Sequence, residues 1–259
     1  MRWMVVLAVM LGCAAQAQAE LHTETVEYRH GDAVLEGYLA YNSHLDHPVP
    51  GVLVVHEWKG LNEYAKRRAR ELAELGYVAF AIDMYGKGIR AADHAEAGRL
   101  SGIYRSDRRL MRDRARAGLN VLTSQPLVDQ TRVAAIGYCF GGTTVLELAR
   151  DGADLVAVAS FHGGLGTPHP EDAQQIKGKV LVLQGADDSF TLPELPAFKE
   201  EMAKTSVDWR VIEYQGAVHS FTVPEAGNDP STGMAYNADA DRKSWVAMRH
   251  LFEEVFGTS

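Results

Sequence analysis

A single cysteine between glycines has the sequence setting of a catalytic nucleophile. Cys139 lies in residues 137–142 (GYCFGG), after an apolar run that ends at Ile136 and before a helical stretch. This is the G-x-S-x-G nucleophile elbow with cysteine in the serine position, and its glycines allow a turn too tight for larger residues. A thiol just before a helix N-terminus has its thiolate favoured by the helix dipole. The alternative is an inert cysteine in a glycine-rich turn, and the strand–turn–helix context favours the catalytic interpretation.

An aspartate and a histidine could complete a catalytic triad with this cysteine. Asp188 lies in the loop after the predicted strand 180–183, and His219 follows the predicted strand 209–214. Asp187 competes with Asp188 for the role of the acid, and the spacing from the preceding glycine favours Asp188. Either aspartate taken alone could be a turn residue or a helix cap. The order nucleophile, acid, histidine and the three positions after strands match a hydrolase triad, in which the acid orients the histidine.

The loop after the predicted strand 51–55 supplies further candidate groups. The main-chain N–H groups of Trp58 and Phe140 are candidates for an oxyanion hole, which stabilises the charge that develops on a carbonyl oxygen. Glu57 has apolar neighbours and is a candidate for a perturbed pKa. The His-Glu pair in this loop does not begin an H-E-x-x-H zinc motif, because Gly60 occupies the place of the second histidine. The sequence indicates no metal and no organic cofactor.

Alternating strand and helix patterns predict how these residues are positioned. An opening antiparallel hairpin is expected at 26–28 and 34–41. Buried strands are expected at 51–55, 77–82, 133–136, 155–160, 180–183 and 209–214. Helices are expected at 62–75, 91–122, 142–150, 195–204 and 235–256. This alternation predicts the α/β fold class, with a mostly parallel central sheet, helices on both faces and a site at the carboxyl ends of the strands.

Composition argues against nucleic acid as a partner, and the N-terminus indicates an exported protein. The 259-residue chain has a formal charge of −8, which argues against nucleic acid as a partner. Arg2, a short apolar run and an Ala-x-Ala site predict a signal peptide over 1–19 and a single mature domain over 20–259. The expected location is periplasmic or secreted, without stable membrane insertion. A lipoprotein modified at Cys13 is the less favoured alternative, and the sequence does not define an oligomeric state.

A basic run over 105–116 is interpreted as a solvated helix face. Its arginines are interleaved with Asp107 and Asp113, which predicts local ion pairs along one helix. On this interpretation the run takes no part in the chemistry, and Arg105 at its start has no assigned role.

These motifs together resemble the dienelactone hydrolase family of α/β-hydrolases, over roughly residues 25–257. The matching segments are His56-Glu57-Trp58-x-Gly60, Asp83-Met84-Tyr85, residues 137–142, Gly185-x-x-Asp188 and His219-Ser220-Phe221-x-x-Pro224. The resemblance implies an α/β-hydrolase fold in which Cys139, Asp188 and His219 form the triad. It also implies that Glu57 contacts the thiol and helps to activate it when substrate enters.

The resemblance further indicates where substrate binds. Family members that act on dienelactone hold the substrate carboxylate with two arginines, and the corresponding positions here are Lys87 and Val223. Valine cannot bind a carboxylate, and lysine lacks the bidentate geometry of arginine. Lys87, Tyr85 and His162 are therefore the candidate substrate-binding residues. Neutral or weakly anionic esters and lactones are the expected substrates.

The function predicted from these residues is hydrolysis of a small ester or lactone through an acyl-cysteine intermediate. A thioesterase or a broad carboxylesterase with the same triad is the alternative within the enzymes. An alternative of another class is a non-catalytic ligand-binding or thiol redox-sensing protein on a hydrolase scaffold. Loss of ester turnover on treatment with a thiol reagent separates the enzymes from these proteins.

Overall fold

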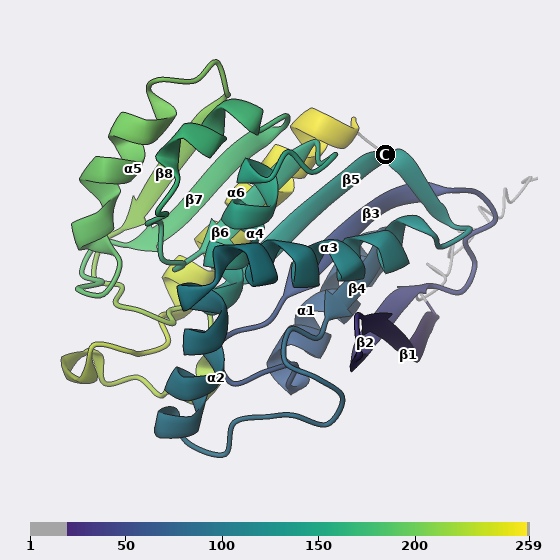
Figure 1. Cartoon of the computed structure of the whole chain (residues 1–259), viewed down its shortest axis with the longest axis horizontal. Helices are drawn as coiled ribbons and strands as arrows, with labels where there is room; N and C mark the ends of the chain where they lie inside the picture. The colour runs from purple at the N-terminus through teal and green to yellow at the C-terminus, as the bar shows by residue number, and fades with distance from the viewer. Residues whose placement is uncertain (1–19, 258–259) are drawn as a thin grey trace, which may run out of the picture.

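The strands predicted from apolar runs form one eight-stranded sheet in the computed structural model, which describes residues 20–257 (Figure 1). They are β1 (Leu21–His30), β2 (Ala33–Asn42), β3 (Val49–Val55), β4 (Val78–Ile82), β5 (Val128–Tyr138), β6 (Ala157–Phe161), β7 (Lys179–Gly185) and β8 (Trp209–Tyr214). Their order across the sheet is β1-β2-β4-β3-β5-β6-β7-β8. β1 and β2 form the predicted antiparallel hairpin, and β3 to β8 pair in parallel. The predicted α/β-hydrolase fold is confirmed.

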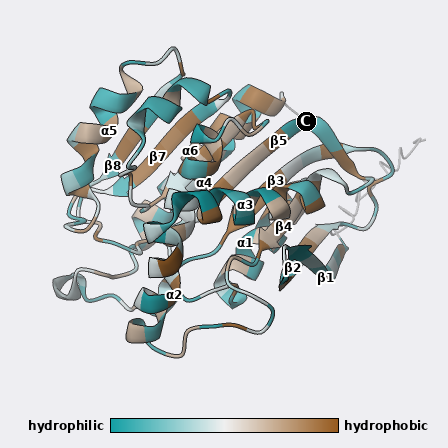
Figure 2. Cartoon of the chain, in the orientation of Figure 1, coloured by the Kyte–Doolittle hydropathy of each residue, from teal (hydrophilic) through white to brown (hydrophobic). Residues whose placement is uncertain are grey.

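Helices cover both faces of this sheet and bury its central strands. α1 (Glu63–Glu74) and α6 (Ala238–Phe256) pack over one hydrophobic core, and α3 (Arg108–Thr123), α4 (Phe140–Arg150) and α5 (Leu195–Met202) pack over the other. Every residue of β3, β4 and β6 is buried. Figure 2 shows apolar residues along the central strands and polar residues on the outer helix surfaces. Cover on both sides explains why these strands are continuous apolar runs rather than alternating ones.

The prediction of one helix over 91–122 is wrong, because the segment forms two helices that meet at Asp107. α2 (His94–Ser106) ends there and α3 begins there. The Asp107 carboxylate accepts a hydrogen bond from Leu110 N at 2.9 Å, which caps the first turn of α3. α2 therefore runs across α3 rather than continuing it (Figure 1).

The parallel strands bring three loops to one edge of the sheet. Cys139 directly follows β5, Asp188 lies three residues after β7, and His219 lies in the loop after β8. Since parallel strands present their carboxyl ends at the same edge, residues far apart in the chain meet there.

The predicted signal peptide and Cys13 lie outside the described residues. Within residues 20–257, no helix combines the length and the apolar character needed to cross a membrane.

Candidate active site

The turn that carries Cys139 holds it in a strained backbone conformation. Cys139 has φ 51° and ψ −112°, a region that residues other than glycine rarely adopt. A Cβ at Gly137 would collide with the Gly141 carbonyl, and a Cβ at Gly141 would collide with the Val55 carbonyl. The glycines on both sides of the cysteine are therefore required by close backbone approach. The turn leaves Cys139 at the N-terminus of α4, as expected for a nucleophile elbow.

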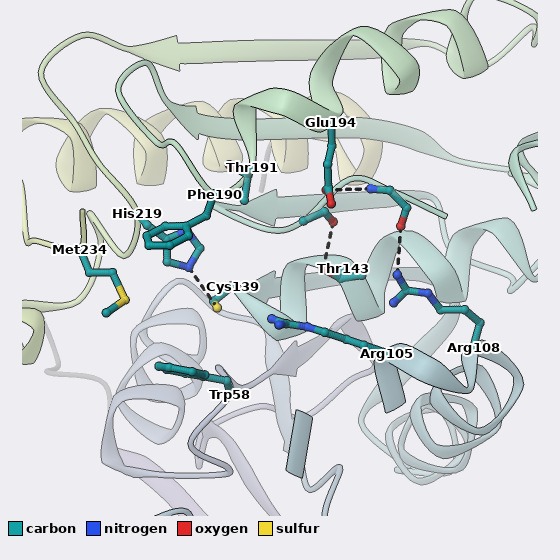
Figure 3. Close-up of a pocket in the computed structure, with 12 residues that line it drawn as sticks. Trp58, Arg105, Arg108, Cys139, Thr143, Phe190, Thr191, Glu194, His219 and Met234 are labelled. Atoms are coloured by element: carbon teal, nitrogen blue, oxygen red, sulfur yellow. Dashed lines mark hydrogen bonds between the residues drawn. The ribbon is translucent and has the colours of Figure 1, made fainter. Parts of the chain in front are cut away.

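The structure brings Cys139, His219 and Asp188 into one hydrogen-bonded chain. His219 Nε2 lies 3.1 Å from Cys139 Sγ, and His219 Nδ1 lies 2.8 Å from Asp188 Oδ2 (Figure 3 shows the cysteine and histidine). The other carboxylate oxygen of Asp188 accepts hydrogen bonds from the main-chain N–H of Phe190 at 2.9 Å and of Thr191 at 3.3 Å. These bonds fix the carboxylate so that it orients the imidazole.

Asp187, the competing acid, does not take part in this chain. Its residue is exposed, whereas Asp188 has no exposed surface. The Asp187 main-chain N–H donates to Ala217 O at 3.0 Å, which joins the acid loop to the histidine loop. The geometry therefore favours Asp188 as the partner of the histidine.

The charges around His219 favour its imidazolium form. Burial opposes that charge, but the neighbouring Cys139 sulfur and Asp188 carboxylate raise the pKa of His219 to about 10. For Asp188, burial opposes ionisation and is outweighed by the hydrogen bond from His219, so the pKa of its carboxyl is lowered. The loop itself is anchored by main-chain bonds of 3.2 Å from His219 N to Gly233 O and 3.0 Å from Ala235 N to His219 O. A cysteine–histidine ion pair is the arrangement that these groups support.

Cys139 and His219 open into a cavity of about 460 Å³ (Figure 3). Trp58, Phe190 and Met234 form its apolar walls. These side chains surround the space next to the sulfur in Figure 3, which leaves room for a small substrate.

Two arginines from the basic run also line this cavity, so its interpretation as a solvated helix face is wrong. The Arg105 guanidinium extends across the cavity toward Cys139 (Figure 3). Arg108 donates to Gly166 O at 3.1 Å, and Arg112 pairs with the fully buried Glu147. Sequence reasoning missed these roles because the break at Asp107 and the packing of α2 decide which side chains reach the cavity.

A second cavity of about 540 Å³ lies beside the first, and Trp58 and Met234 line both. Glu57 opens into this second cavity, and burial raises the pKa of its carboxyl to about 7 against the charges of His219 and Lys59. The implied contact between Glu57 and the thiol is not formed. Among the residues that the structure describes, the hydrogen-bond partner of Cys139 Sγ is His219.

The two expected oxyanion donors lie beside the sulfur. Phe140 is the first residue of α4 and follows Cys139 directly, while Trp58 lines the cavity. Within residues 20–257, neither main-chain N–H donates a hydrogen bond to another protein group. The Trp58 carbonyl accepts a bond of 2.8 Å from the Tyr85 hydroxyl, which fixes this loop. Both donors are therefore available to a substrate oxygen.

The three candidate substrate-binding residues line neither cavity. Lys87 is half exposed and its Nζ lies 2.7 Å from Glu27 Oε2 of the β1–β2 hairpin, because the acidic hairpin attracts the long cationic side chain. His162 is fully buried, with Nε2 2.8 Å from Thr222 Oγ1 and its ring edge-to-face with His219. Tyr85 uses its hydroxyl to bind the Trp58 carbonyl and so holds that loop in place. We therefore remove all three from the substrate-binding set and replace them with Arg105.

Metal ligation has no candidate in the described part of the chain. No group of three or more His, Cys, Asp or Glu side chains within residues 20–257 is close enough to hold a metal ion.

The comparisons with protein families, solved structures and related sequences agree with one another. Residues 35–256 match the dienelactone hydrolase family. The solved structure of m3DLH is 43% identical, with a TM-score of 0.88 over 92% of this chain and 99% of that chain. A dienelactone hydrolase-like promiscuous phosphotriesterase from metagenomic libraries is 44% identical, with a TM-score of 0.86 over the same shares. A carboxymethylenebutenolidase of a Pseudomonas species is 31% identical over 165 residues, which cover 60% of this chain and 68% of that protein.

Proposed function

Since this chain belongs to the dienelactone hydrolase family and is a carboxylic ester hydrolase, we propose that it hydrolyses small esters or lactones through an acyl intermediate on Cys139. The observation that carries the proposal is the distance of 3.1 Å between Cys139 Sγ and His219 Nε2, at the wall of a cavity that admits a small molecule. A thiolate held by an imidazolium in this way is ready to attack a carbonyl carbon.

Acylation begins when the thiolate sulfur attacks the carbonyl carbon and the C=O electron pair moves onto oxygen. The Trp58 and Phe140 N–H groups hold this oxyanion. When the C=O bond re-forms, the bond to the alcohol oxygen breaks, and His219 Nε2 gives its proton to the leaving alkoxide. A pKa of about 10 keeps His219 protonated at neutral pH, so the proton is present when the alkoxide leaves.

Deacylation reverses the role of the histidine. Transfer of its proton to the alkoxide leaves His219 neutral, so its Nε2 accepts a proton from the attacking water. The hydroxide adds to the thioester carbon, the C–S bond breaks, and the thiolate is restored beside the imidazolium. Asp188 holds Nδ1–H throughout, so that Nε2 is always the nitrogen that faces the reacting atoms.

Glu57 has a separate role in this proposal. The family resemblance assigns it to activation of the thiol, and this role requires its carboxyl to rotate from the second cavity toward Cys139. A carboxyl with a pKa of about 7 is divided between acid and carboxylate at neutral pH. Since His219 already holds the sulfur as thiolate in this proposal, Glu57 acts on enzyme in which Cys139 is protonated, where its carboxylate takes the thiol proton.

The test is to trap the acyl-enzyme. Wild type is mixed with p-nitrophenyl acetate, quenched with acid and digested, and the peptide that contains Cys139 is weighed by mass spectrometry. An added acetyl group on Cys139, together with a burst of p-nitrophenolate, is the expected result. If the protein is instead a thioesterase, it should hydrolyse an acyl thioester faster than an ester that carries the same acyl group. A protein that reacts with iodoacetamide but hydrolyses no ester, lactone or thioester would contradict the proposal and favour binding or redox sensing.

A second activity, cleavage of phosphotriesters, is also proposed. The 44% identical relative is described as a promiscuous phosphotriesterase. The Arg105 guanidinium, which forms no ion pair with a residue that the structure describes, is suited to the oxygens of a phosphoryl group. Turnover of paraoxon by wild type, with none by Cys139→Ala, is the expected result.

We further propose that residues 1–19 are removed on export and that the mature protein begins at Glu20. The Ala-x-Ala site behind a short apolar run supports this. N-terminal sequencing of the protein from a periplasmic or secreted fraction is the test. A lipid-modified Cys13 as the first residue would replace this form with a lipoprotein.

A further inference from the structure

The two cavities beside the catalytic cysteine share a wall but differ in what they contain. Trp58 and Met234 line both, so these side chains stand between them. Cys139 lines only the first cavity, whereas Glu57 and Val223 line only the second. A substrate that reacts at the sulfur therefore has two distinct places for the groups on either side of its scissile bond.

The first cavity has an excess of positive charge. Arg105 and Arg108 line it, and Arg105 forms no ion pair with any described residue. Glu194 is the acidic residue of this cavity, and its carboxylate already accepts hydrogen bonds from two main-chain N–H groups, that of Gly166 at 2.9 Å and that of Leu165. The first cavity thus offers an uncommitted guanidinium to an anion.

The second cavity has the opposite character. Three carboxyl residues, Glu57, Glu63 and Glu225, line it together with Lys59. Glu57 is 6% exposed, and burial raises the pKa of its carboxyl, because a charge at this position loses hydration. Val223 presents an apolar side chain to the same space. A carboxylate placed here would lose hydration and gain no guanidinium.

The chemistry assigns each half of an ester to one cavity. The acyl carbon becomes bonded to Cys139 Sγ, so the acyl part stays in the cavity into which the sulfur opens. The alcohol oxygen takes its proton from His219. His219 itself lines the first cavity, and the residues that follow it, Ser220 and Val223, line the second, so the proton donor lies where the two cavities adjoin. The alcohol part therefore lies on the side of Met234 that faces the carboxyl groups.

We propose that the first cavity holds the acyl part of the ester and the second cavity holds the alcohol part. An anionic group is accepted on the acyl part, where Arg105 binds it, and rejected on the alcohol part. The alcohol part is uncharged. The inference rests on the proposed ester hydrolysis and adds the position of charge on the substrate. It refines the sequence-based expectation of neutral or weakly anionic substrates, which rested on Lys87 and Val223, by placing the negative charge on the acyl part.

A pair of isomeric esters tests the assignment. Monomethyl succinate carries its carboxylate on the acyl part, and the acetate ester of β-hydroxypropanoate carries the same group on the alcohol part. The two have the same atoms and the same charge at neutral pH, so size and net charge do not separate them. Wild type is expected to hydrolyse monomethyl succinate with a kcat/KM at least about tenfold higher, as one charged hydrogen bond in the transition state allows.

Variants then locate the two effects. Arg105→Met is expected to lower kcat/KM for monomethyl succinate about tenfold or more and to leave methyl butyrate, its neutral analogue, unchanged. Arg109→Met is the matched control, because Arg109 is 92% exposed and lines neither cavity. Glu225→Lys is expected to raise the rate with the acetate ester of β-hydroxypropanoate, and Glu200→Lys on the exposed face of α5 is its control.

The outcomes distinguish a failure of this inference from a failure of the proposed ester hydrolysis on which it rests. Equal rates with the two isomers, a preference for the anionic alcohol, or an Arg105→Met variant that keeps the wild-type preference would each overturn the division of the substrate. A Glu225→Lys variant that behaves like its control overturns the assignment of the alcohol part to the second cavity. Failure to hydrolyse any ester, p-nitrophenyl acetate included, would instead contradict the proposed function.

Discussion

Two buried polar clusters in this protein use charge in opposite ways. One is the chain of Cys139, His219 and Asp188 at the carboxyl edge of the sheet. The other lies behind α4, and its five charged residues alternate in sign. Its members, in order of contact, are Glu201, Arg150, Glu147, Arg112 and Asp172.

The clusters differ in backbone and in access. Arg150 and Glu147 lie in regular helix and are at most 1% exposed, and Arg150 binds both oxygens of Glu201 at 2.7 and 2.9 Å. Each charge there forms an ion pair within the cluster, and only Arg112 and Asp172 at its end are partly exposed, at 12% and 19%. Cys139 has a positive φ and faces a cavity. The difference indicates that the ion cluster stabilises the structure. The triad instead keeps the Cys139 sulfur open to the cavity, where a substrate can meet it.

The ion cluster also contributes to the site through one contact. Arg150 donates to Leu165 O at 2.9 Å, and the neighbouring Gly164 and Gly166 line the cavity beside the cysteine. A rigid cluster therefore fixes a wall of the reactive cavity without touching the substrate. Mutations in the two clusters are expected to separate activity from stability.

The largest expected effect is the loss of activity in Cys139→Ala. Removal of the nucleophile prevents formation of the acyl-enzyme, so ester turnover should fall by about 10⁴-fold or more. The small change in a strained turn should leave the fold intact, which circular dichroism and the thermal midpoint check. Undiminished hydrolysis of p-nitrophenyl acetate by this variant would end the catalytic interpretation of the elbow.

Loss of either triad partner should follow closely. His219→Ala and Asp188→Asn are each expected to lower kcat by about 10³-fold, since triad members act as a unit. Asp187→Asn is the matched control and should stay within a few-fold of wild type, because Asp187 makes no side-chain contact with the histidine. An Asp187→Asn variant as impaired as Asp188→Asn would show that the acid has been assigned to the wrong residue.

Glu201→Ala should reverse the pattern, with stability lost and activity kept. The change leaves the buried Arg150 guanidinium without its bidentate partner, and such a loss costs about 3–5 kcal/mol. Urea unfolding measures the free energy, and kcat is measured well below the thermal midpoint. Glu200→Ala, an exposed neighbour in the same helix, is the control. A stability equal to that control, or a kcat as low as in Asp188→Asn, would remove the contrast between the clusters.

The strands and the triad could be predicted from sequence because both depend on local patterns. Continuous apolar runs such as β3 require cover on both faces, and chemistry is expected where such strands end. Cys139, Asp188 and His219 each occupy such a position.

The cavities could not be predicted in the same way. Arg105 lines the cavity beside the sulfur because α2 turns at Asp107, and Lys87 is drawn away because the β1–β2 hairpin is acidic. His162 follows a strand, as the triad residues do, yet it is buried behind His219. In each case the packing of a helix or hairpin against the edge of the sheet decides the outcome, and no short sequence pattern encodes that packing.

The smallest expected effect concerns Glu57, which belongs to neither cluster and is buried without a cationic partner of its own. Its pKa of about 7 in the folded protein lies above its ordinary value of 4.5. The folded state therefore binds this proton more tightly than the unfolded chain does, so stability falls as pH rises from about 4.5 and the loss is complete above about 7.

Glu57→Gln has no proton to lose. It should match wild type at about pH 5 and exceed its stability at about pH 8, by up to about 3 kcal/mol. Urea unfolding at both pH values measures the difference, with the exposed Glu200→Gln as control. Parallel pH profiles for wild type and Glu57→Gln would show that this carboxyl ionises as freely in the folded protein as in the unfolded chain.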